Sequence, residues 1–355
     1  MRSMKSETGR KLGFGIISAS YMAMDHVRGV KANKHAEVKA ICDIDLAKAE
    51  RVAAEFFIQD YYADYTELLK RDDIDVIIVS TPDQLHAEMT IAALEAGKHV
   101  LCEKPMALTI EECKQMIDAS ERTGKKLMVG QICRYAPGFA LAKKLIDDGE
   151  IGELFYVESE YAHDYSEAPG VGNWRIDPVR LRHPVLGGGC HAVDLLRWIA
   201  GNPYEVTAYA NRKVLQSWPV DDCTIAIMRF PQDVIGKVMV SVGCKRAYTM
   251  RSVFYGNQGT IIVDNTSPTL TIYKDRISGD TGLFNDVNDQ TISISHPVNI
   301  RSHNTIDEIK EFVDILLNDD QVRTDGVEGA STAAVCLAIV ESASTNQSVR
   351  IQYDF

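Results

Sequence analysis

The chain is 355 residues long, with 45% hydrophobic and 25% charged residues. This length and composition are typical of a globular protein with about two domains, each large enough to bury a core. The formal net charge of −12 and sequence pI of about 5.3 disfavour a nucleic-acid partner, because phosphate groups are repelled by an acidic protein.

The first eleven residues, MRSMKSETGRK, are polar and basic and do not have the apolar core of a secretion signal. No run approaches the roughly 18 consecutive apolar residues of a membrane span. We therefore expect a cytoplasmic protein with no membrane partner. The eight cysteines are scattered singly, with no CxxC or Cys/His cluster, so neither disulfides nor a metal site are expected.

The N-terminal part alternates short apolar runs with amphipathic segments. The expected strands lie at 12–18, 38–43, 75–81, 99–104 and 126–131, with helices that include 45–57 and 109–123. Continuous apolar strands separated by helices predict a parallel sheet covered on both faces. We expect an α/β fold that begins with a doubly wound (Rossmann) dinucleotide-binding domain over 1–134.

After a helix near 138–148 the pattern changes to longer alternating segments. These lie at 154–162, 205–212, 222–230, 234–244, 251–264 and 269–274, and are followed by helices near 304–317 and 328–345 and a last strand, VRIQY. The alternation predicts an α+β domain over 135–355 with a large open sheet, mainly antiparallel or mixed. We expect this domain to serve substrate binding and oligomerisation. Apolar positions on both faces of this sheet predict a homodimer or homotetramer. The Asp-, Gly- and Asn-rich stretch 275–289 is expected to be an exposed loop.

The turn after the first strand is the expected place for the dinucleotide pyrophosphate. A G-x-G-x-x-G motif would lie there, but the chain has Ser18-Ala19-Ser20-Tyr21-Met22-Ala23. A serine costs conformational freedom wherever the backbone needs a positive φ, and a plain strand-to-helix turn is the alternative interpretation. The expected cofactor contacts here are Ser18, Ser20, Tyr21 and Met22.

Asp43 ends the next strand, 23 residues after Ser20. There its carboxylate could bind the ribose hydroxyls of NAD and repel the additional phosphate of NADP, so NAD is expected rather than NADP. The alternative is that Asp43 caps the helix at 45–57, a role that Asp45 could share.

Three segments carry a resemblance to a known family. They are IDVIIVSTP at 74–82, the CEKP that places Lys104 at a strand exit, and GCHAVDLLRW at 189–198, with His191 and Asp194 on one helix face. With the order of elements around them, these segments make the chain similar to the Gfo/Idh/MocA oxidoreductases. The resemblance implies an NAD(P)-dependent dehydrogenase or reductase that transfers a hydride between the nicotinamide and a sugar, cyclitol or related polyol.

By this resemblance Lys104 polarises the substrate oxygen and His191 accepts the proton, which general base catalysis requires. Asp194 could orient His191, or instead pair with Arg197 or a backbone group. The resemblance also implies cofactor contacts at Thr81, Pro82, His86, Glu103, Lys104 and Arg134.

One position departs from the family pattern. Many members have an acid four residues before the histidine, and this chain has Gly187 there. Asp177 or Asp164 could supply an acid instead, and we expect Asp177 at the catalytic site. The expected substrate contacts are Lys104, Arg175, Asp177, His191 and Asp194, with Arg134 a further candidate for binding hydroxyls or carboxylates.

Two other functions stay open, and the departures at Gly187 and at the serine-containing turn favour the first of them. One is a non-catalytic dinucleotide sensor on the same fold. The other is an NAD-assisted glycoside-cleaving enzyme, an activity that the family also contains.

Overall fold

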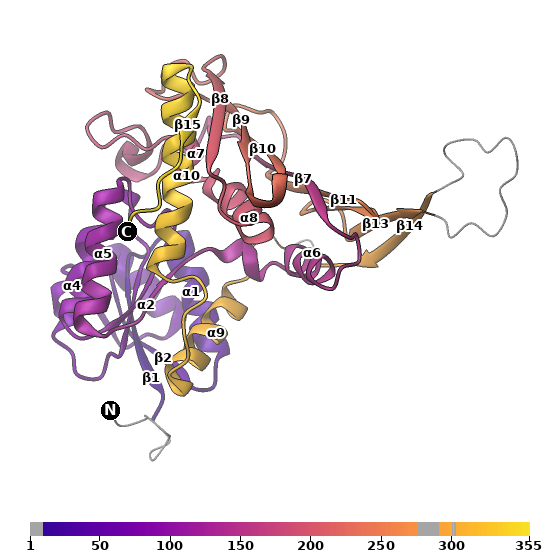
Figure 1. Cartoon of the computed structure of the whole chain (residues 1–355). Helices are drawn as coiled ribbons and strands as arrows, with labels where there is room; N and C mark the ends of the chain where they lie inside the picture. Colours follow the sequence, from indigo (N-terminus) through magenta and orange to yellow (C-terminus); the bar gives the residue numbers. More distant parts are fainter. Residues whose placement is uncertain (1–9, 276–290, 300, 302) are drawn as a thin grey trace, which may run out of the picture. The chain divides into compact units, whose positions relative to one another are not determined.

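The computed structural model describes residues 10–275, 291–299, 301 and 303–355 (Figure 1). The chain divides into two compact units. The first contains Met1–Ile132, Asn304–Ala333 and Asp354–Phe355, and the second contains Cys133–His303 and Ala334–Tyr353. The expected domains, 1–134 and 135–355, differ from this division in placing 304–333 with the second part.

The first unit contains a parallel six-stranded sheet in the order β3-β2-β1-β4-β5-β6. Its strands are β1 Leu12–Ile17, β2 Ala36–Cys42, β3 Asp60–Tyr62, β4 Val76–Val79, β5 His99–Cys102 and β6 Leu127–Val129. The order reverses between β1 and β4, which is where a doubly wound sheet opens its ligand crevice at the carboxyl ends of the strands. Central residues such as Phe14, Ile78 and Leu101 are fully buried.

Helices cover this sheet and connect its strands. They are α1 Tyr21–Ala32, α2 Leu46–Phe56, α3 Thr66–Leu69, α4 His86–Glu95 after the short η1 Asp83–Leu85, and α5 Ile110–Thr123. Helix α4 packs on α5, while α1 packs on α9, Thr305–Asn318, from near the end of the chain (Figure 1). Gly29 permits this last contact, because a Cβ there would lie 2.9 Å from the Thr305 carbonyl oxygen. The packing of α9 on α1 explains why 304–333 belongs to the first unit.

The second unit contains a nine-stranded sheet in the order β14-β13-β12-β11-β7-β10-β9-β8-β15. Its strands are β7 Leu154–Ala162, β8 Glu205–Asn211, β9 Cys223–Arg229, β10 Ile235–Ser241, β11 Thr249–Gly256, β12 Gly259–Asp264, β13 Thr269–Asp275, β14 Thr291–Pro297 and β15 Val349–Arg350. Only the β10–β7 pair is parallel among the pairs described. The sheet is therefore mixed and mostly antiparallel, as expected.

Helices of the second unit lie on one face of this sheet. Helix α8, Cys190–Ala200, packs on β7 and β10, and α6, Pro137–Asp147, packs on β12 and β13. The remaining short helices are η2 Ile132–Tyr135, η3 Val171–Ile176, α7 Pro184–Gly187 and η4 Pro231–Asp233. Gly187 ends α7, and two more glycines, Gly188 and Gly189, separate it from α8 and bring the start of α8 close to the sheet.

Helix α10, Gly326–Thr345, contributes to both units, since Ala333 is assigned to the first and Ala334 to the second. Among the described residues it alone is long and apolar enough to cross a membrane, with a mean hydropathy of 1.2 over its most apolar window. Of that window, 67% is buried inside the protein. This burial is typical of a core helix, so length and composition are weak evidence for a membrane span.

Three features of the fold differ from the sequence-based expectations. The seven-residue strand β14 and the three-residue strand β3 were not expected, and the last strand covers only Val349–Arg350 of the VRIQY segment. The pattern of β3 and of the last strand is too short to be recognised, because two or three residues do not reveal a period of two. The loop expected at 275–289 lies almost wholly outside the described residues.

Candidate active site

The turn after β1 keeps a glycine-like backbone conformation at its first residue, although serines stand where glycines were expected. Ser18 has a φ of 107°, a left-handed conformation that glycine adopts without strain. Its hydroxyl oxygen accepts the Ser20 N–H at 3.0 Å, which holds the turn. Ser20 caps α1 by accepting the Ala23 N–H at 3.3 Å. The backbone thus keeps the conformation that the missing glycine would allow and directs the N-terminus of α1 to this edge of the sheet.

Asp43 lies at the end of β2 and is tied to the same turn. One carboxylate oxygen accepts the Ala19 N–H at 2.8 Å and the Lys48 ammonium at 3.0 Å, and the other accepts the Asp45 N–H at 3.0 Å. Asp45 is the cap of α2, because its side chain accepts the Lys48 N–H. Asp43 is therefore not the cap of that helix, and its carboxylate joins the first and second strand ends.

Thr81, Pro82 and His86 follow β4. The Thr81 hydroxyl oxygen is buried and has no hydrogen-bond partner among the described residues. His86 is fully buried, with Nδ1 2.8 Å from the Pro105 carbonyl oxygen and Nε2 3.1 Å from that of Thr81. Because carbonyl oxygens only accept, both ring nitrogens donate. Burial disfavours the charged ring, but interactions with Cys102, Asp83 and the Pro105 carbonyl raise the pKa of His86 to about 9. His86 thus links the loops after β4 and β5.

Lys104 follows β5, is half-buried, and precedes Pro105 through a cis peptide bond. Its N–H donates to the Glu103 carboxylate at 3.1 Å, and His26 Nε2 donates to the other oxygen of that carboxylate at 2.8 Å. Burial raises the pKa of Glu103, but His26 and Lys104 outweigh it and lower that pKa to about 2. An ionised Glu103 therefore ties the lysine loop to helix α1.

Glu308 of α9 extends this buried cluster. Its side chain is fully buried, one oxygen lies 4.0 Å from His26 Nδ1, and neither oxygen has a hydrogen-bond partner in the described part of the chain. Burial, together with the charges of Glu103 and Glu311, raises the pKa of Glu308 well above its usual range. Burial therefore favours the protonated, neutral form of the Glu308 carboxyl.

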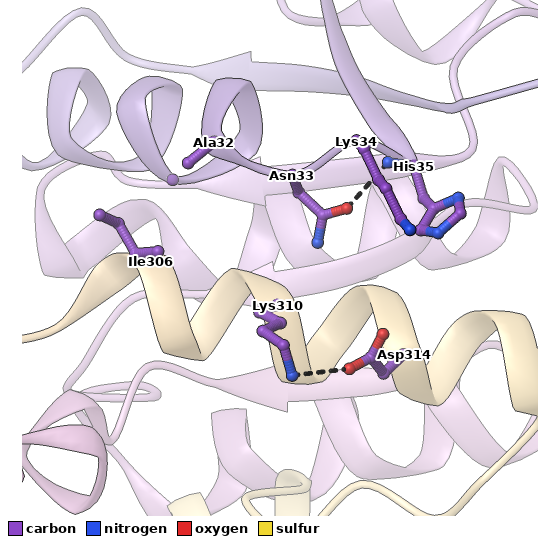
Figure 2. A pocket seen from close by; sticks show the side chains of 8 residues that line it. Ala32, Asn33, Lys34, His35, Ile306, Lys310 and Asp314 are labelled. Atoms are coloured by element: carbon purple, nitrogen blue, oxygen red, sulfur yellow. Dashed lines mark hydrogen bonds and ion pairs between the residues drawn. The ribbon is translucent and has the colours of Figure 1, made fainter.

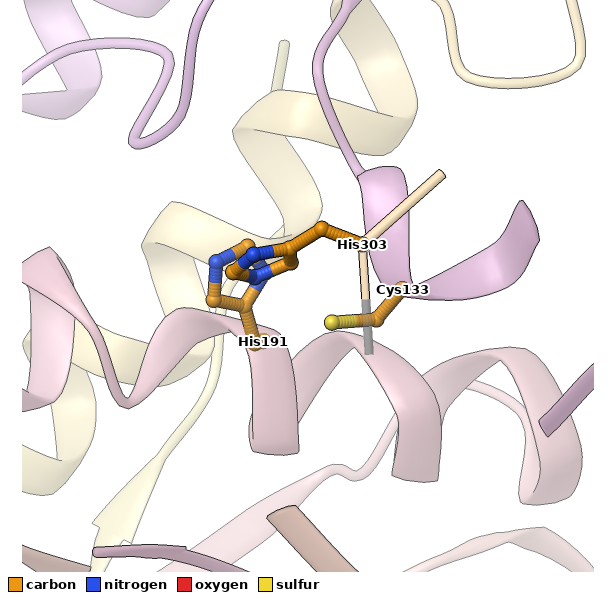
Figure 3. Close-up of side chains that lie close together, drawn as sticks. All are labelled: Cys133, His191 and His303. Atoms are coloured by element: carbon orange, nitrogen blue, oxygen red, sulfur yellow. The ribbon is translucent and has the colours of Figure 1, made fainter. Parts of the chain in front are cut away.

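His191 lies in the first turn of α8 and is 4% exposed. Its ring centroid is 5.1 Å from that of His303 and 6.4 Å from that of Tyr161. Cys133, His191 and His303 each present one potential metal-ligand atom, and these three atoms lie within 4.8 Å of one another (Figure 3). We call this set the thiol–imidazole cluster. Cysteine and histidine are ligands that zinc prefers, although no Cys/His spacing in the sequence indicates the cluster.

Asp194 forms a buried ion pair with Arg134. The guanidinium donates to both carboxylate oxygens, at 2.9 Å and 2.7 Å, and Arg197 lies 3.7 Å from one of them. Of the alternatives considered for Asp194, the pairing with Arg197 is therefore observed, and Arg134 is an additional partner. The pair joins η2 to α8, the helix that carries His191.

Asp177, Arg175 and Asp164 lie in the loops after β7. The Asp177 carboxylate accepts the Val179 N–H at 2.9 Å, and Arg175 donates to the Ala168 carbonyl at 2.9 Å. Asp164 accepts from Ser166 and from the Lys245 ammonium at 2.9 Å. Each of these side chains is engaged with its own loop or with a neighbouring one.

The space next to Gly187 is filled by a residue that sequence reasoning missed. A Cβ on Gly187 would lie 2.0 Å from Cζ of Arg182, and Arg182 is only 5% exposed. Nothing in the sequence indicated His26, Glu308, Cys133 or His303, because their contacts join distant segments. Arg182, five residues before Gly187, was missed as well. The signal that could have found Arg182 is the run of three glycines, which shows that another side chain comes close to this turn.

A surface hollow of 380 Å3 lies at the other end of α1 (Figure 2). Lys34, His35 and the Lys310–Asp314 ion pair line it. The 12-residue helix separates this hollow from the Ser18 turn by about 18 Å. The hollow is therefore distinct from the dinucleotide site.

A doubly wound sheet with this turn, followed by a mixed sheet that carries a buried histidine on a helix, defines a dinucleotide-dependent oxidoreductase. Sequence comparison agrees. Residues 12–131 match the profile of the oxidoreductase family with an NAD-binding Rossmann fold, and residues 139–262 match the GFO/IDH/MocA C-terminal domain. The chain belongs to the Gfo/Idh/MocA family and is an NAD-dependent oxidoreductase.

The similar proteins include enzymes of known activity. The 1,5-anhydro-D-fructose reductase of Ensifer adhaerens is 28% identical over 349 residues, which cover 96% of this chain and 98% of that enzyme. The inositol 2-dehydrogenase of Salmonella typhimurium is 28% identical over 249 residues, which cover 69% of this chain and 71% of that enzyme. A solved structure of levoglucosan dehydrogenase in complex with NADH has a TM-score of 0.86 and 25% identity, and the match covers 97% of this chain and 100% of that one.

Proposed function

We propose that this enzyme oxidises or reduces a CH–OH carbon of a sugar, cyclitol or related polyol with NAD as the hydride carrier. This proposal rests on one observation: the same chain contains both family domains, a lysine at the exit of β5 and a buried histidine at the start of α8. The named activities of its relatives, on inositol, anhydrofructose and levoglucosan, support the substrate class.

The first unit has features that fit NAD. The buried Thr81 hydroxyl, which no described residue satisfies, could bond to the cofactor, since buried polar groups are nearly always paired. The N-terminus of α1 suits a pyrophosphate. In this proposal the groups that hold NAD are Ser18, Ser20, Tyr21, Met22, Asp43, Thr81 and Pro82. His86 and Glu103 act by positioning the loops that follow β4 and β5, and Arg134 by fixing η2.

At the reacting carbon, bound NAD supplies or accepts the hydride. The Lys104 ammonium stabilises the substrate oxygen while charge develops on it, and a ring nitrogen of His191 takes the hydroxyl proton during oxidation or returns it during reduction. Glu103 positions Lys104 through its backbone N–H. Asp177 and Arg175 are proposed to bind the substrate from the loop over 163–183.

Nicotinamide absorbance with a panel of sugars and inositols tests this function. On a substrate that turns over, Lys104→Ala should lower kcat by roughly 10²- to 10³-fold and His191→Asn by roughly 10²- to 10⁴-fold. Calorimetric NAD affinity should stay close to wild type. Lys34→Ala, at an exposed lysine of the distant hollow, is the matched control. Wild-type turnover in both site variants would refute these roles, and NAD binding without turnover on any substrate would favour a sensor.

Asp177→Asn examines whether a loop acid replaces the one absent at Gly187. A large loss of kcat would identify an acid in the reaction, whereas a change in KM alone would identify a hydroxyl-binding group. Asp164→Asn is the control, since Asp164 is held by Ser166 and Lys245.

We also propose a homo-oligomer assembled through the second unit and acting in the cytoplasm. Along β8, β9 and β10, buried residues alternate with exposed ones, so the face opposite the helices is open. Its exposed apolar residues include Tyr209, Ile225, Ile227, Ile235, Tyr255 and Tyr273. A contiguous apolar face of this kind typically marks an interface. Light scattering should give a mass well above 39.4 kDa, and a stable monomer at micromolar concentration would contradict the assembly.

A further inference from the structure

The inference concerns the contact between helices α1 and α9, where His26 and Glu308 meet. Both side chains are fully buried, and His26 Nδ1 lies 4.0 Å from one Glu308 oxygen. Neither that nitrogen nor either Glu308 oxygen has a hydrogen-bond partner among the described residues. Buried polar groups are nearly always paired, directly or through an ordered water. We therefore expect these atoms to pair with one another.

The hydrogens of this contact can be assigned from Glu103. Its ionised carboxylate only accepts, so His26 Nε2, 2.8 Å away, carries a hydrogen. In a neutral ring Nδ1 is then an acceptor. Glu308 can donate to it, because burial and the charges of Glu103 and Glu311 raise the pKa of Glu308 and favour its protonated form. The carboxyl hydroxyl and the bare ring nitrogen are thus complementary.

The distance between the two side chains allows a direct or a water-mediated bond. A separation of 4.0 Å is longer than a hydrogen bond, and either a small rotation of Glu308 or one internal water closes it. The helices pack closely at Gly29, where a Cβ would lie 2.9 Å from the Thr305 carbonyl oxygen. This packing holds His26 and Glu308 opposite each other.

The contact leads to the lysine that we propose as catalytic. Glu103 accepts from His26 with one carboxylate oxygen and from the Lys104 N–H with the other, at 3.1 Å. Contacts therefore run from Glu308 on α9 through α1 to the loop after β5, all within the first unit. The hydrogen bond at one ring nitrogen of a histidine determines what the other nitrogen presents. A group that binds His26 Nδ1 consequently also holds Glu103 and the Lys104 backbone.

We propose that the Glu308 carboxyl donates a hydrogen bond to His26 Nδ1, directly or through one internal water, and is thereby a positioning residue for Lys104. The proposal rests on the proposed function, since it adds a residue to the support of its catalytic lysine. The bond itself can be tested without a substrate.

Nitrogen-15 NMR of histidine-labelled protein measures this bond. Near neutral pH, Nδ1 of His26 should carry no proton in the wild type and should have the shift of a hydrogen-bonded ring nitrogen. In Glu308→Met its resonance should move to the shift of an unbonded nitrogen, whereas Glu308→Gln should keep most of the bonded shift because an amide N–H can still donate. Glu311→Met, the same substitution one turn later at a partner of Arg323, is the control.

Hydrogen exchange and turnover measure the consequence for Lys104. In Glu308→Met the Lys104 N–H should exchange roughly 10-fold faster, while the buried strand residue Leu101 keeps its wild-type protection. On a substrate that turns over, kcat should fall roughly 10- to 100-fold with little change in the KM for NAD. Glu308→Gln should restore most of both. A merely structural role would instead lower protection across the whole first unit, and the glutamine would not restore kcat selectively.

Thermal unfolding establishes that each variant is folded, and Glu308→Ala replaces Glu308→Met if the methionine does not fit. A protonated Nδ1 in the wild type, or an unchanged Nδ1 shift without the carboxyl, would overturn the bond. Unchanged Lys104 exchange and unchanged kcat would overturn the positioning role and leave the proposed function intact. If no substrate turns over, the proposed function fails, whereas the nitrogen shift and the Lys104 exchange still decide this inference.

Discussion

Replacing Asp43 by serine should remove the preference for NAD over NADP. In the wild type the Asp43 carboxylate is bound by the Lys48 ammonium at 3.0 Å and by the Ala19 N–H at 2.8 Å. Asp43→Ser removes the negative charge at the end of β2 and leaves the Lys48 ammonium beside the site. A 2′-phosphate would then meet a cation instead of an anion.

The size of the effect follows from the charges. Two unit charges about 4 Å apart interact by about 1 kcal/mol in water and about 4 kcal/mol near a protein surface. The Asp43 side chain is 10% exposed and Lys48 offsets part of its charge, so we take about 2 kcal/mol for its repulsion of a 2′-phosphate. That corresponds to roughly 30-fold in the ratio of dissociation constants.

Calorimetry with NAD and NADP on wild type and Asp43→Ser measures this ratio. Asp45→Ser is the control, because it alters a neighbouring acid that caps α2. Adding Lys48→Ala to Asp43→Ser should cancel the gain in NADP affinity. Equal or tighter NADP binding by the wild type, or an unchanged ratio in Asp43→Ser, would refute the reasoning.

Four further outcomes are expected. Ser18→Gly should change the free energy of unfolding by less than about 1 kcal/mol, seen in urea titration, because relief of the strained φ of 107° is offset by loss of the hydroxyl that accepts the Ser20 N–H and by the greater entropy of the unfolded chain. Asp194→Asn should lower it by about 3 kcal/mol, since Arg134 keeps its charge but loses its buried ionised partner. Glu308→Gln should stabilise the protein above pH 4.5 and not below it. Its raised native pKa makes wild-type stability fall as the pH rises from 4.5 toward that pKa, and glutamine removes this dependence. Zinc ions should inhibit wild-type turnover by binding the thiol–imidazole cluster, and a chelator should restore the activity. In Cys133→Ala, which lacks the thiol ligand, zinc should no longer inhibit.

The long elements could be predicted from the sequence because their periods are clear. The apolar run at 75–81 contains β4, and the alternating segment 251–264 folds as the hairpin of β11 and β12, with Gly256 opposite Gly259. Lys104 could be placed at a strand exit because strand ends face the crevice in a doubly wound sheet.

Tertiary contacts explain what the sequence could not predict. The link from Glu308 through His26 to Glu103 depends on α9 returning to α1, far along the chain. Asp194 was expected near His191 from their helical spacing, yet Arg134 from another segment pairs with it. The positive φ at Ser18 also could not be read from residue type, because serine seldom adopts it.

The packing beside Gly187 changes how a glycine at the position of a family acid is interpreted. A glycine in place of an acid usually suggests an inactivated enzyme, but here the vacated volume is occupied by a charged group from five residues earlier in the chain. The pattern Arg-x4-Gly-x3-His, as in RHPVLGGGCH, contains both the glycine and the arginine that fills the space beside it. Related sequences that have both the arginine and the glycine should have a guanidinium at this position. Sequences that have the glycine but not the arginine should have neither a guanidinium nor a carboxylate there. Comparing the two positions together would separate chains in which another side chain fills this space from chains in which the space is empty.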